Sequence, residues 1–129
     1  MTDTPVTLER LGDEQYLLLT TFRRDGTAVP TPVWAVRDGD ALLVWTVGDS
    51  GKVKRIRRDG AVTVAPCTVR GRPKADPVPA TATLLDPEGA VQARELIKKK
   101  YGLQGRLFVW ASLRRRGADA TIGIRITLV

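Results

Sequence analysis

The sequence contains no histidine and only one cysteine, Cys67, among its 129 residues. Because histidine is the commonest general base and metal ligand, its absence excludes Ser-His-Asp and Cys-His catalytic sites and argues against ordinary zinc chemistry. A single cysteine also excludes an intramolecular disulfide, so nothing points to an oxidising compartment and we expect a cytoplasmic protein. No base stands beside Cys67 in the sequence, and we interpret it as a small buried apolar residue rather than a nucleophile.

Long apolar runs and aromatic side chains are scarce as well. No apolar run approaches about 18 residues, and the polar start of the chain lacks the basic and apolar regions of a signal peptide, so we expect no membrane partner. The aromatic residues are three Trp, two Tyr and two Phe, and none of them alternates with the clusters of cations. A surface that stacks single-stranded nucleic acid interleaves the two kinds of residue, which argues against a nucleic-acid partner.

Positive charge is what the sequence has in excess. Lysine and arginine number 21 against 14 acidic residues, which gives a net charge of +7 and a pI near 10.2. Such an excess predicts affinity for an anion. Composition alone does not say whether that anion is a nucleic acid, an acidic membrane surface or a small phosphorylated or polycarboxylate ligand. The charge is densest in DSGKVKRIRRDG, residues 49–60, which holds five cations.

Periodicity and turn signals predict the secondary structure of a single domain, residues 1–129. Apolar and β-branched runs predict six strands, at 16–24, 27–36, 41–47, 61–70, 78–86 and 120–129. Helices are predicted at 6–15, 51–58 and 87–102, and of the two structures that fit 106–116 we favour a helix over a strand. Asp-Gly turns join the first three strands into an antiparallel meander. The pattern predicts a small antiparallel β-barrel with two or three helices packed on it.

The helix predicted at 51–58 carries most of the dense charge. Ser50 is expected to cap its start and Gly60 to stop it. With about 100° between successive residues, Val53 and Ile56 share the face that would pack on the barrel. The cations on the opposite face are interpreted as solvated; they are Lys54 and Arg58.

Lys52 lies in the first turn of this helix, where a cation is unfavourable for the helix dipole, and Arg55 can project beside it one turn later. The free N–H groups of a helix start, the Ser50 hydroxyl and the close approach that Gly51 permits complete an anion site of the kind that binds phosphate. The alternative, in which Ser50 only caps the helix and Lys52 extends into solvent, stays open. The stretch GDSGKV lacks the spacing of a Walker A loop, which excludes that class of nucleotide site.

Four stretches of the sequence, taken in order, resemble a known group of proteins. They are YLLLTTFRRDGTAVPTPVWAV, LLVWT, DSGKVKRIRRD and VTVAPCTVRGRP. Over residues 14–104 the chain is similar to the split β-barrel proteins of the pyridoxamine-phosphate-oxidase-like superfamily, and within it to the actinobacterial branch of deazaflavin (coenzyme F-420) dependent oxidoreductases. The resemblance implies a six-stranded antiparallel split barrel of the FMN-binding type, which forms a homodimer with a cofactor groove at each end of the interface.

The resemblance also implies a function, which is hydride transfer between the reduced deazaflavin and a small organic substrate. Such a transfer needs no catalytic acid from the protein in principle, which suits a chain without histidine. Similar proteins variously use the deazaflavin, FMN, FAD or haem, so FMN is an alternative cofactor. A non-catalytic binding or carrier protein for a flavin, a deazaflavin or haem is the alternative function.

For the cofactor phosphate, the resemblance implies a place at the basic helix start, against Ser50, Gly51, Lys52 and Arg55. For the ring system it implies a place against the second and third strands, near Pro32, Val33, Trp34, Thr46 and Val47. Trp34 or Trp45 could stack on the ring, although an aromatic residue on a barrel strand more often packs in the core or at a dimer interface. The partner chain is implied to close the groove, through Arg70 and Arg72 or the region around Trp110.

Two further roles have several candidates. The oligoglutamate tail of the deazaflavin is a polyanion that suits the remaining positive charge, and Lys98–Lys100 and Arg114–Arg116 are candidates for holding it. A solvated run of charge is the alternative for each. If a proton must be delivered during the reaction, Tyr16, Ser112 or a bound water are the candidates.

Overall fold

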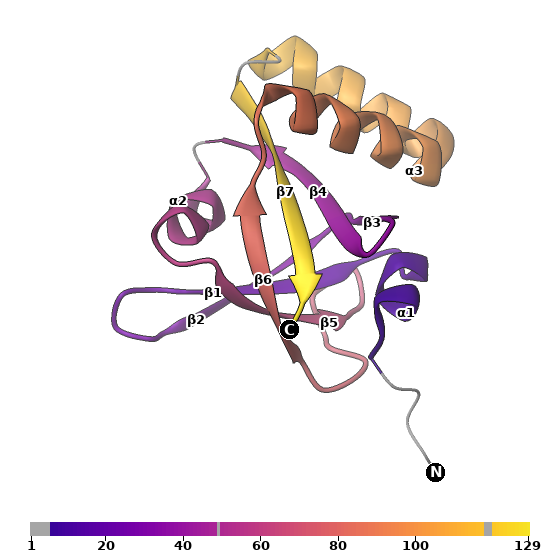
Figure 1. Cartoon of the computed structure of the whole chain (residues 1–129). Helices are drawn as coiled ribbons and strands as arrows, with labels where there is room; N and C mark the ends of the chain where they lie inside the picture. Colours follow the sequence, from indigo (N-terminus) through magenta and orange to yellow (C-terminus); the bar gives the residue numbers. More distant parts are fainter. Residues whose placement is uncertain (1–5, 49, 118–119) are drawn as a thin grey trace.

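The computed structural model describes residues 6–48, 50–117 and 120–129. In these ranges the chain forms seven strands and three helices (Figure 1). The strands are β1 (Leu17–Phe22), β2 (Ala28–Val33), β3 (Val36–Asp38), β4 (Ala41–Val47), β5 (Ala61–Pro66), β6 (Val78–Leu84) and β7 (Thr121–Leu128). The helices are α1 (Leu8–Asp13), α2 (Gly51–Arg58) and α3 (Pro87–Arg116). Each corresponds to a predicted element except β3, and α3 joins two predicted helices.

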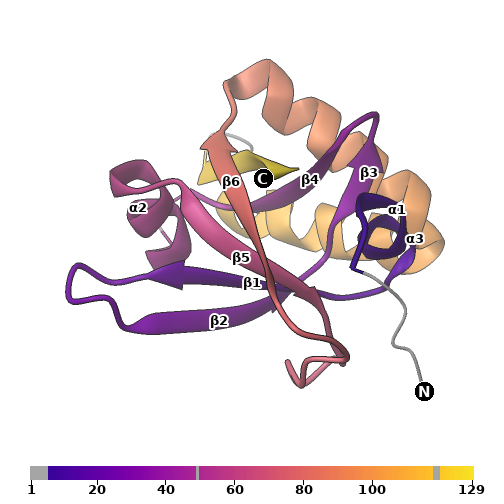
Figure 2. The ribbon, with the colours of Figure 1, turned by 60° about the horizontal axis from the view of Figure 1, so that its bottom comes forward.

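All seven strands belong to one antiparallel sheet with the order β2-β1-β5-β6-β7-β4-β3. The sheet curls, so that β1 and β2 run across the direction of β6 (Figures 1 and 2). This arrangement confirms the predicted antiparallel split barrel, with seven strands in place of six. Strand β7 is an interior strand, paired on one side with β6 and on the other with β4.

The additional strand arises because the predicted strand 27–36 breaks at Trp34 and Ala35. Strand β2 pairs with β1 as far as Val33, and β3 pairs with β4 from Val36 onward. The two pieces lie at opposite edges of the sheet. The predicted three-stranded meander is therefore wrong, since β5, β6 and β7 separate the β1–β2 hairpin from the β3–β4 hairpin. The break is held by the side chain of Tyr101 in α3, which accepts a hydrogen bond from the backbone N–H of Ala35. Tyr101 is so distant from the break in sequence that no local pattern reveals this contact.

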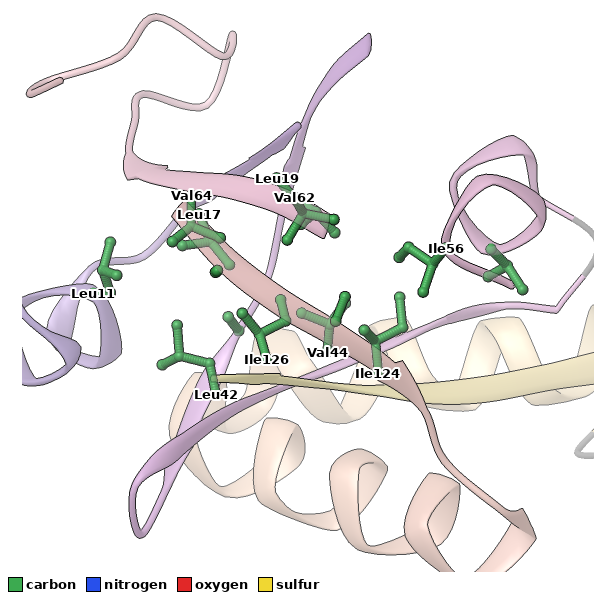
Figure 3. Close-up of a cluster of buried hydrophobic side chains, with 14 residues drawn as sticks. Leu11, Leu17, Leu19, Leu42, Val44, Ile56, Val62, Val64, Ile124 and Ile126 are labelled. Atoms are coloured by element: carbon green, nitrogen blue, oxygen red, sulfur yellow. The ribbon is translucent and has the colours of Figure 1, made fainter. Parts of the chain in front are cut away.

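Aliphatic side chains fill the interior of the curled sheet (Figure 3). Strands β1, β4 and β7 contribute side chains that are almost completely buried, including Leu19, Val44 and Ile126. Val53 and Ile56 of α2 pack against the same cluster, which confirms the predicted buried face of that helix. Burying each such side chain contributes about 1.5–3 kcal/mol, so this core fixes α2 against the sheet.

Cys67 follows β5 and forms an isolated bridge with Pro73. Its side chain is 2% exposed and packs with Leu18 and Ala65. Burial raises the pKa of its thiol. The structure therefore confirms the interpretation of Cys67 as a buried apolar residue.

Helix α3 contains a sharp reversal at Gly102, where φ is 62° and ψ is −137°. Glycine adopts this backbone conformation readily, whereas other residues do not. The segments before and after Gly102 lie side by side against the sheet (Figures 1 and 2). Ile97 of the first segment and Val109 of the second pack with Trp45 of β4 in a second apolar cluster. Both helices predicted in this region are confirmed.

Candidate functional site

A groove of about 360 Å³ lies between β2, β4 and the second segment of α3. Five of the predicted cofactor-binding residues line it, namely Pro32, Val33, Trp34, Thr46 and Lys52. Tyr16, Thr31, Trp45 and Phe108 complete the lining. Because the sheet curls, residues from strands that are not neighbours in the sheet meet at one surface.

Aromatic rings form a continuous wall at this groove. The Trp34 indole stacks on the Tyr101 ring, with centroids 4.2 Å apart and planes 7° apart. The Phe108 ring lies 5.1 Å from Trp34 in a tilted arrangement and 6.2 Å from Trp45 in an edge-on one. Such a wall offers a planar ligand apolar ring surface on which to pack. Trp34 and Trp45 therefore both line the groove and pack in the protein.

The position of Trp34 is fixed by hydrogen bonds around the strand break. The Tyr101 hydroxyl lies 2.7 Å from the carbonyl oxygen of Gln15, to which it donates, and accepts from the backbone N–H of Ala35 at 3.3 Å. Burial raises the pKa of Tyr101 to about 12, so its hydroxyl stays protonated across the physiological range. The break between β2 and β3 is thus held by the helix that covers the groove.

The run Lys98–Lys100 differs from both interpretations made of it. The Lys100 ammonium donates to the carbonyl oxygens of Glu14 at 2.7 Å and Ala35 at 2.5 Å. Burial lowers the pKa of Lys100 to about 8, against the effect of nearby carboxylates. Lys98 pairs with Glu95 at 3.1 Å. The run is therefore neither uniformly solvated nor free as a whole to hold a polyanion.

Lys52 is the cation of α2 that reaches the groove. The pKa of the half-buried Lys52 ammonium is lowered, mainly by burial and secondarily by the charge of Arg55. The Ser50 hydroxyl accepts from the backbone N–H of Val53 at 3.4 Å, which confirms the predicted cap. Ser50 thus caps the helix, and Lys52 lies against a groove rather than extending freely into solvent.

The other predicted residues of the helix start lie outside the groove lining. A Cβ at Gly51 would lie 2.7 Å from Nη1 of Arg55, so that guanidinium covers the glycine. Arg55 donates from Nε to Oγ1 of Thr21 at 2.6 Å, which turns it towards β1. Val47 ends β4, and its carbonyl oxygen accepts from the Ser50 N–H at 3.2 Å.

Arg55 belongs to a second concavity, which sequence reasoning missed. Its volume is about 300 Å³, and all of its lining residues are cationic. We call this concavity the cation recess; it is lined by Arg23, Arg24, Lys54, Arg55 and Arg58. Arg58 donates from Nη2 to the carbonyl oxygen of Phe22 at 2.6 Å, so the end of α2 is tied to the β1–β2 hairpin. The pair Arg23-Arg24 in that hairpin could have indicated a cationic site, but nothing in the sequence places the hairpin beside α2.

The residues expected to act from a partner chain are not among those that line the groove of their own chain. Arg70 and Arg72 are exposed on the loop between β5 and β6. Trp110 is 59% exposed, and the Arg114 guanidinium lies 5.4 Å from its ring centroid. Ser112 does not line the groove. What these residues do in a dimer stays a prediction.

Few side chains at the groove can exchange a proton. Among the described lining residues, Tyr16 and Lys52 alone are titratable.

Within the described residues, no three His, Cys, Asp or Glu side chains come together as a metal site. The described helices also include none with the length and apolarity to cross a membrane. Sequence reasoning did not identify two of the lining residues, Thr31 and Phe108. The place of Phe108 depends on the reversal at Gly102.

Solved structures share this fold. One is named an F420 reductase, with a TM-score of 0.61 and 19% identity over 98% of this chain and 96% of that one. Another is the haem storage protein HutZ from Vibrio cholerae, with a TM-score of 0.68 and 12% identity over 96% and 92%. A third is a candidate pyridoxamine 5'-phosphate oxidase from Listeria innocua, with a TM-score of 0.59 and 18% identity over 94% and 86%. No protein-family model matches the sequence, and neither does any curated protein.

Proposed function

We propose that this chain, whose fold is the split barrel of the pyridoxamine-phosphate-oxidase-like proteins, is a cytoplasmic oxidoreductase that uses the deazaflavin coenzyme F-420. Its reaction is hydride transfer between the reduced cofactor and a small organic substrate. The observation that carries the proposal is the place of Lys52, which lies in a groove with an aromatic wall and close to the charge of Arg55 in the cation recess.

The described residues fit the parts of this cofactor. The aromatic wall and Pro32 suit a flat ring system, and the Lys52 ammonium suits its phosphodiester. The cation recess suits the oligoglutamate tail, because its lining has no carboxylate. FMN ends in a single phosphate and would leave the recess without a partner. This difference favours the deazaflavin over FMN.

When bound, the reduced deazaflavin supplies the hydride. The protein holds the ring against β2 and β4 and excludes water with the apolar side chains of Val33 and Phe108. Tyr16 is the lining residue whose hydroxyl could give a proton to the substrate.

A binding titration tests the proposal. The purified protein would be titrated with coenzyme F-420, FMN, FAD and haem, and the series repeated with Lys52→Ala. Lys99→Ala is the matched control, because Lys99 is exposed on α3 outside the groove. We expect the deazaflavin to bind most tightly, and Lys52→Ala to weaken it by about tenfold to a hundredfold. Measurable affinity for none of the four compounds would overturn the proposal.

Arg24→Gln separates the deazaflavin from FMN. Arg24 lines the cation recess and not the groove, whereas Arg57 is an exposed cation of α2 that lines neither, so Arg57→Gln is the control. We expect Arg24→Gln to weaken binding of the deazaflavin, more so at low salt, and to leave any FMN binding unchanged. Equal losses for both cofactors would remove the recess from the argument and leave FMN as the alternative.

A carrier protein without turnover is the second candidate function. The groove favours it in one respect, since its described lining contains no acid–base pair. Steady-state oxidation of reduced coenzyme F-420 with a panel of acceptors would distinguish the two functions. Tight binding without turnover for any acceptor would favour the carrier.

We also propose that the protein works as a homodimer. Leu103, Leu107 and Trp110 share one face of the second segment of α3 and are 74%, 58% and 59% exposed. Phe108, on the same segment, lines the groove, so a partner on this face would complete the enclosure. Leu107→Glu is expected to shift the sedimentation coefficient from dimer to monomer and to weaken cofactor binding. A wild-type chain that sediments as a monomer would contradict this.

A further inference from the structure

A third concavity, distinct from the groove and the cation recess, is lined by α3 and by the end of the sheet at which β4 ends and β7 begins. Figure 1 shows α3 crossing this end of the sheet. The volume of this cavity is about 310 Å³, at the lower end of the range of small-molecule sites. Pro87, Ala90, Val91 and Arg94 line it from one face of α3, and Trp45 and Ile122 line it from the sheet. The walls are therefore apolar apart from a few polar groups, as in a ligand site.

The walls of this cavity belong to rigid elements. Gly123 lies opposite Trp45 in the β4–β7 ladder. A Cβ at Gly123 would lie only 3.2 Å from the Cα of Ala90, so the start of α3 packs directly on the backbone of β7. Val91 and Arg94 line the cavity from the same helix, so its walls are held by the packing of α3 on the sheet. A preformed site loses little conformational freedom on binding.

Arg94 places a positive charge at the wall of the cavity. Its side chain is 20% exposed, and its Nε lies 3.3 Å from a carboxylate oxygen of Glu95. That carboxylate is shared with Lys98 at 3.1 Å. The two terminal guanidinium nitrogens of Arg94 have no hydrogen-bond partner among the described residues. They are the pair of donors that arginine uses to hold a carboxylate in bidentate fashion.

The one acidic lining residue lies at the other end. Asp86 caps α3 by accepting from the Gly89 N–H at 2.8 Å. It precedes Arg94 by eight residues, which corresponds to about 12 Å along a helix. A ligand whose carboxylate meets the terminal nitrogens of Arg94 can therefore lay its apolar part along Val91 and Trp45 and stay clear of Asp86. It shares the Arg94 guanidinium with the Glu95 carboxylate, which pairs at Nε.

We propose that this cavity binds a small carboxylic acid with an apolar body, and that Arg94 holds the carboxylate. Trp45 is the residue that lines both this cavity and the groove. An acid bound here contacts the same indole that forms part of the groove wall. Binding itself does not depend on the identity of the cofactor.

Titration of the full chain with 4-phenylbutyrate tests the proposal. Binding would be monitored by calorimetry and by backbone amide chemical shifts. We expect a Kd of about 1 mM or tighter, with the largest shifts in residues 86–94 and 121–123. The neutral analogue 4-phenylbutanamide is expected to bind at least about tenfold more weakly, because it lacks the charge that Arg94 recognises. Tighter binding of 4-phenylbutylamine than of the acid would assign the recognition to Asp86 and overturn the proposal.

Two variants separate recognition from folding. Arg94→Gln is expected to weaken the binding of 4-phenylbutyrate by about tenfold or more and to leave the binding of the amide analogue unchanged. Arg57→Gln is its control. Val91→Trp, at a position 46% exposed, fills the cavity without altering the charge and is expected to abolish binding of both compounds. Shifts that map outside the cavity, or an acid affinity unchanged by Arg94→Gln, would show that the assignment is wrong.

Discussion

The Trp34 indole and the Tyr101 phenol ring lie parallel at 4.2 Å, although 67 positions separate them in the sequence. Trp34 belongs to the break between β2 and β3, and Tyr101 to the end of the first segment of α3. The stack therefore joins the strand that lines the groove to the helix that covers it. A change at Tyr101 is transmitted to the groove through a ring in direct contact.

Tyr101→Phe removes the hydroxyl and keeps the ring. The N–H of Ala35 and the carbonyl of Gln15 then lose their partner, and we expect the free energy of unfolding to fall by about 1–3 kcal/mol. Tyr101→Leu also removes the stack and is expected to cost more. Urea unfolding of the three proteins measures both steps. A Phe variant as stable as the wild type would mean that the hydroxyl does not hold the strand break.

Lys100→Met tests the buried ammonium through pH. The pKa of Lys100 is about 8 in the folded chain and ordinarily 10.5, so between these values the unfolded chain binds more protons and wild-type stability rises with pH. The variant lacks this rise and also leaves two carbonyls without a donor.

We expect Lys100→Met to be less stable than wild type by an amount that grows from about pH 8 to about pH 10. Chemical unfolding at both pH values measures the difference. Lys99→Met, an exposed neighbour, should show no such trend. A difference that shrinks with pH would contradict the burial of a charged Lys100.

Cofactor binding should also depend on pH through Lys52. Burial and Arg55 lower its pKa, so Lys52 loses its charge at lower pH than an ordinary lysine does. We expect the Kd for an anionic cofactor to increase as the pH rises from about 7 to about 10. Lys52→Arg keeps the charge over that range and should flatten the profile. A wild-type profile as flat as that of the Arg variant would exclude Lys52 as the titrating group.

Gly102→Ala should destabilise the helical reversal. At φ 62° and ψ −137° a Cβ meets no neighbouring atom within 4 Å, so the cost is one of backbone strain, about 1–3 kcal/mol. Gln104→Ala, exposed on the next turn, is the control and should change stability little. Thermal and urea unfolding measure both, and a neutral Gly102→Ala would show that the reversal tolerates a side chain.

Local patterns in the sequence were sufficient for most elements. The buried face of α2, its cap at Ser50 and the strand over Thr121–Leu128 follow from spacing of about 3.6 or 2 residues. Pro30 and Pro32 fit the edge strand in which they lie, since proline cannot donate to a neighbouring strand. These features depend on residues close together in the chain.

The features that sequence reasoning missed depend on contacts between distant segments. The break after Val33 is held by Tyr101, and Phe108 reaches the groove only because α3 reverses. Arg23 and Arg24 meet α2 because the β1–β2 hairpin lies beside it. Lys100 reads as one cation in a charged run, and its two carbonyl partners are 86 and 65 residues away. No periodicity carries such information.

Strand β7 is the last of the seven in chain order, yet it lies inside the sheet and joins β6 to β4. During synthesis the earlier strands therefore leave the ribosome before the strand that joins β6 to β4 has been made. Until β7 arrives, β4 and β6 each present an unpaired edge, which is the kind of surface that drives aggregation of incomplete sheets. The nascent chain thus passes through a vulnerable interval that the finished protein does not show, and chaperones would be expected to act during it.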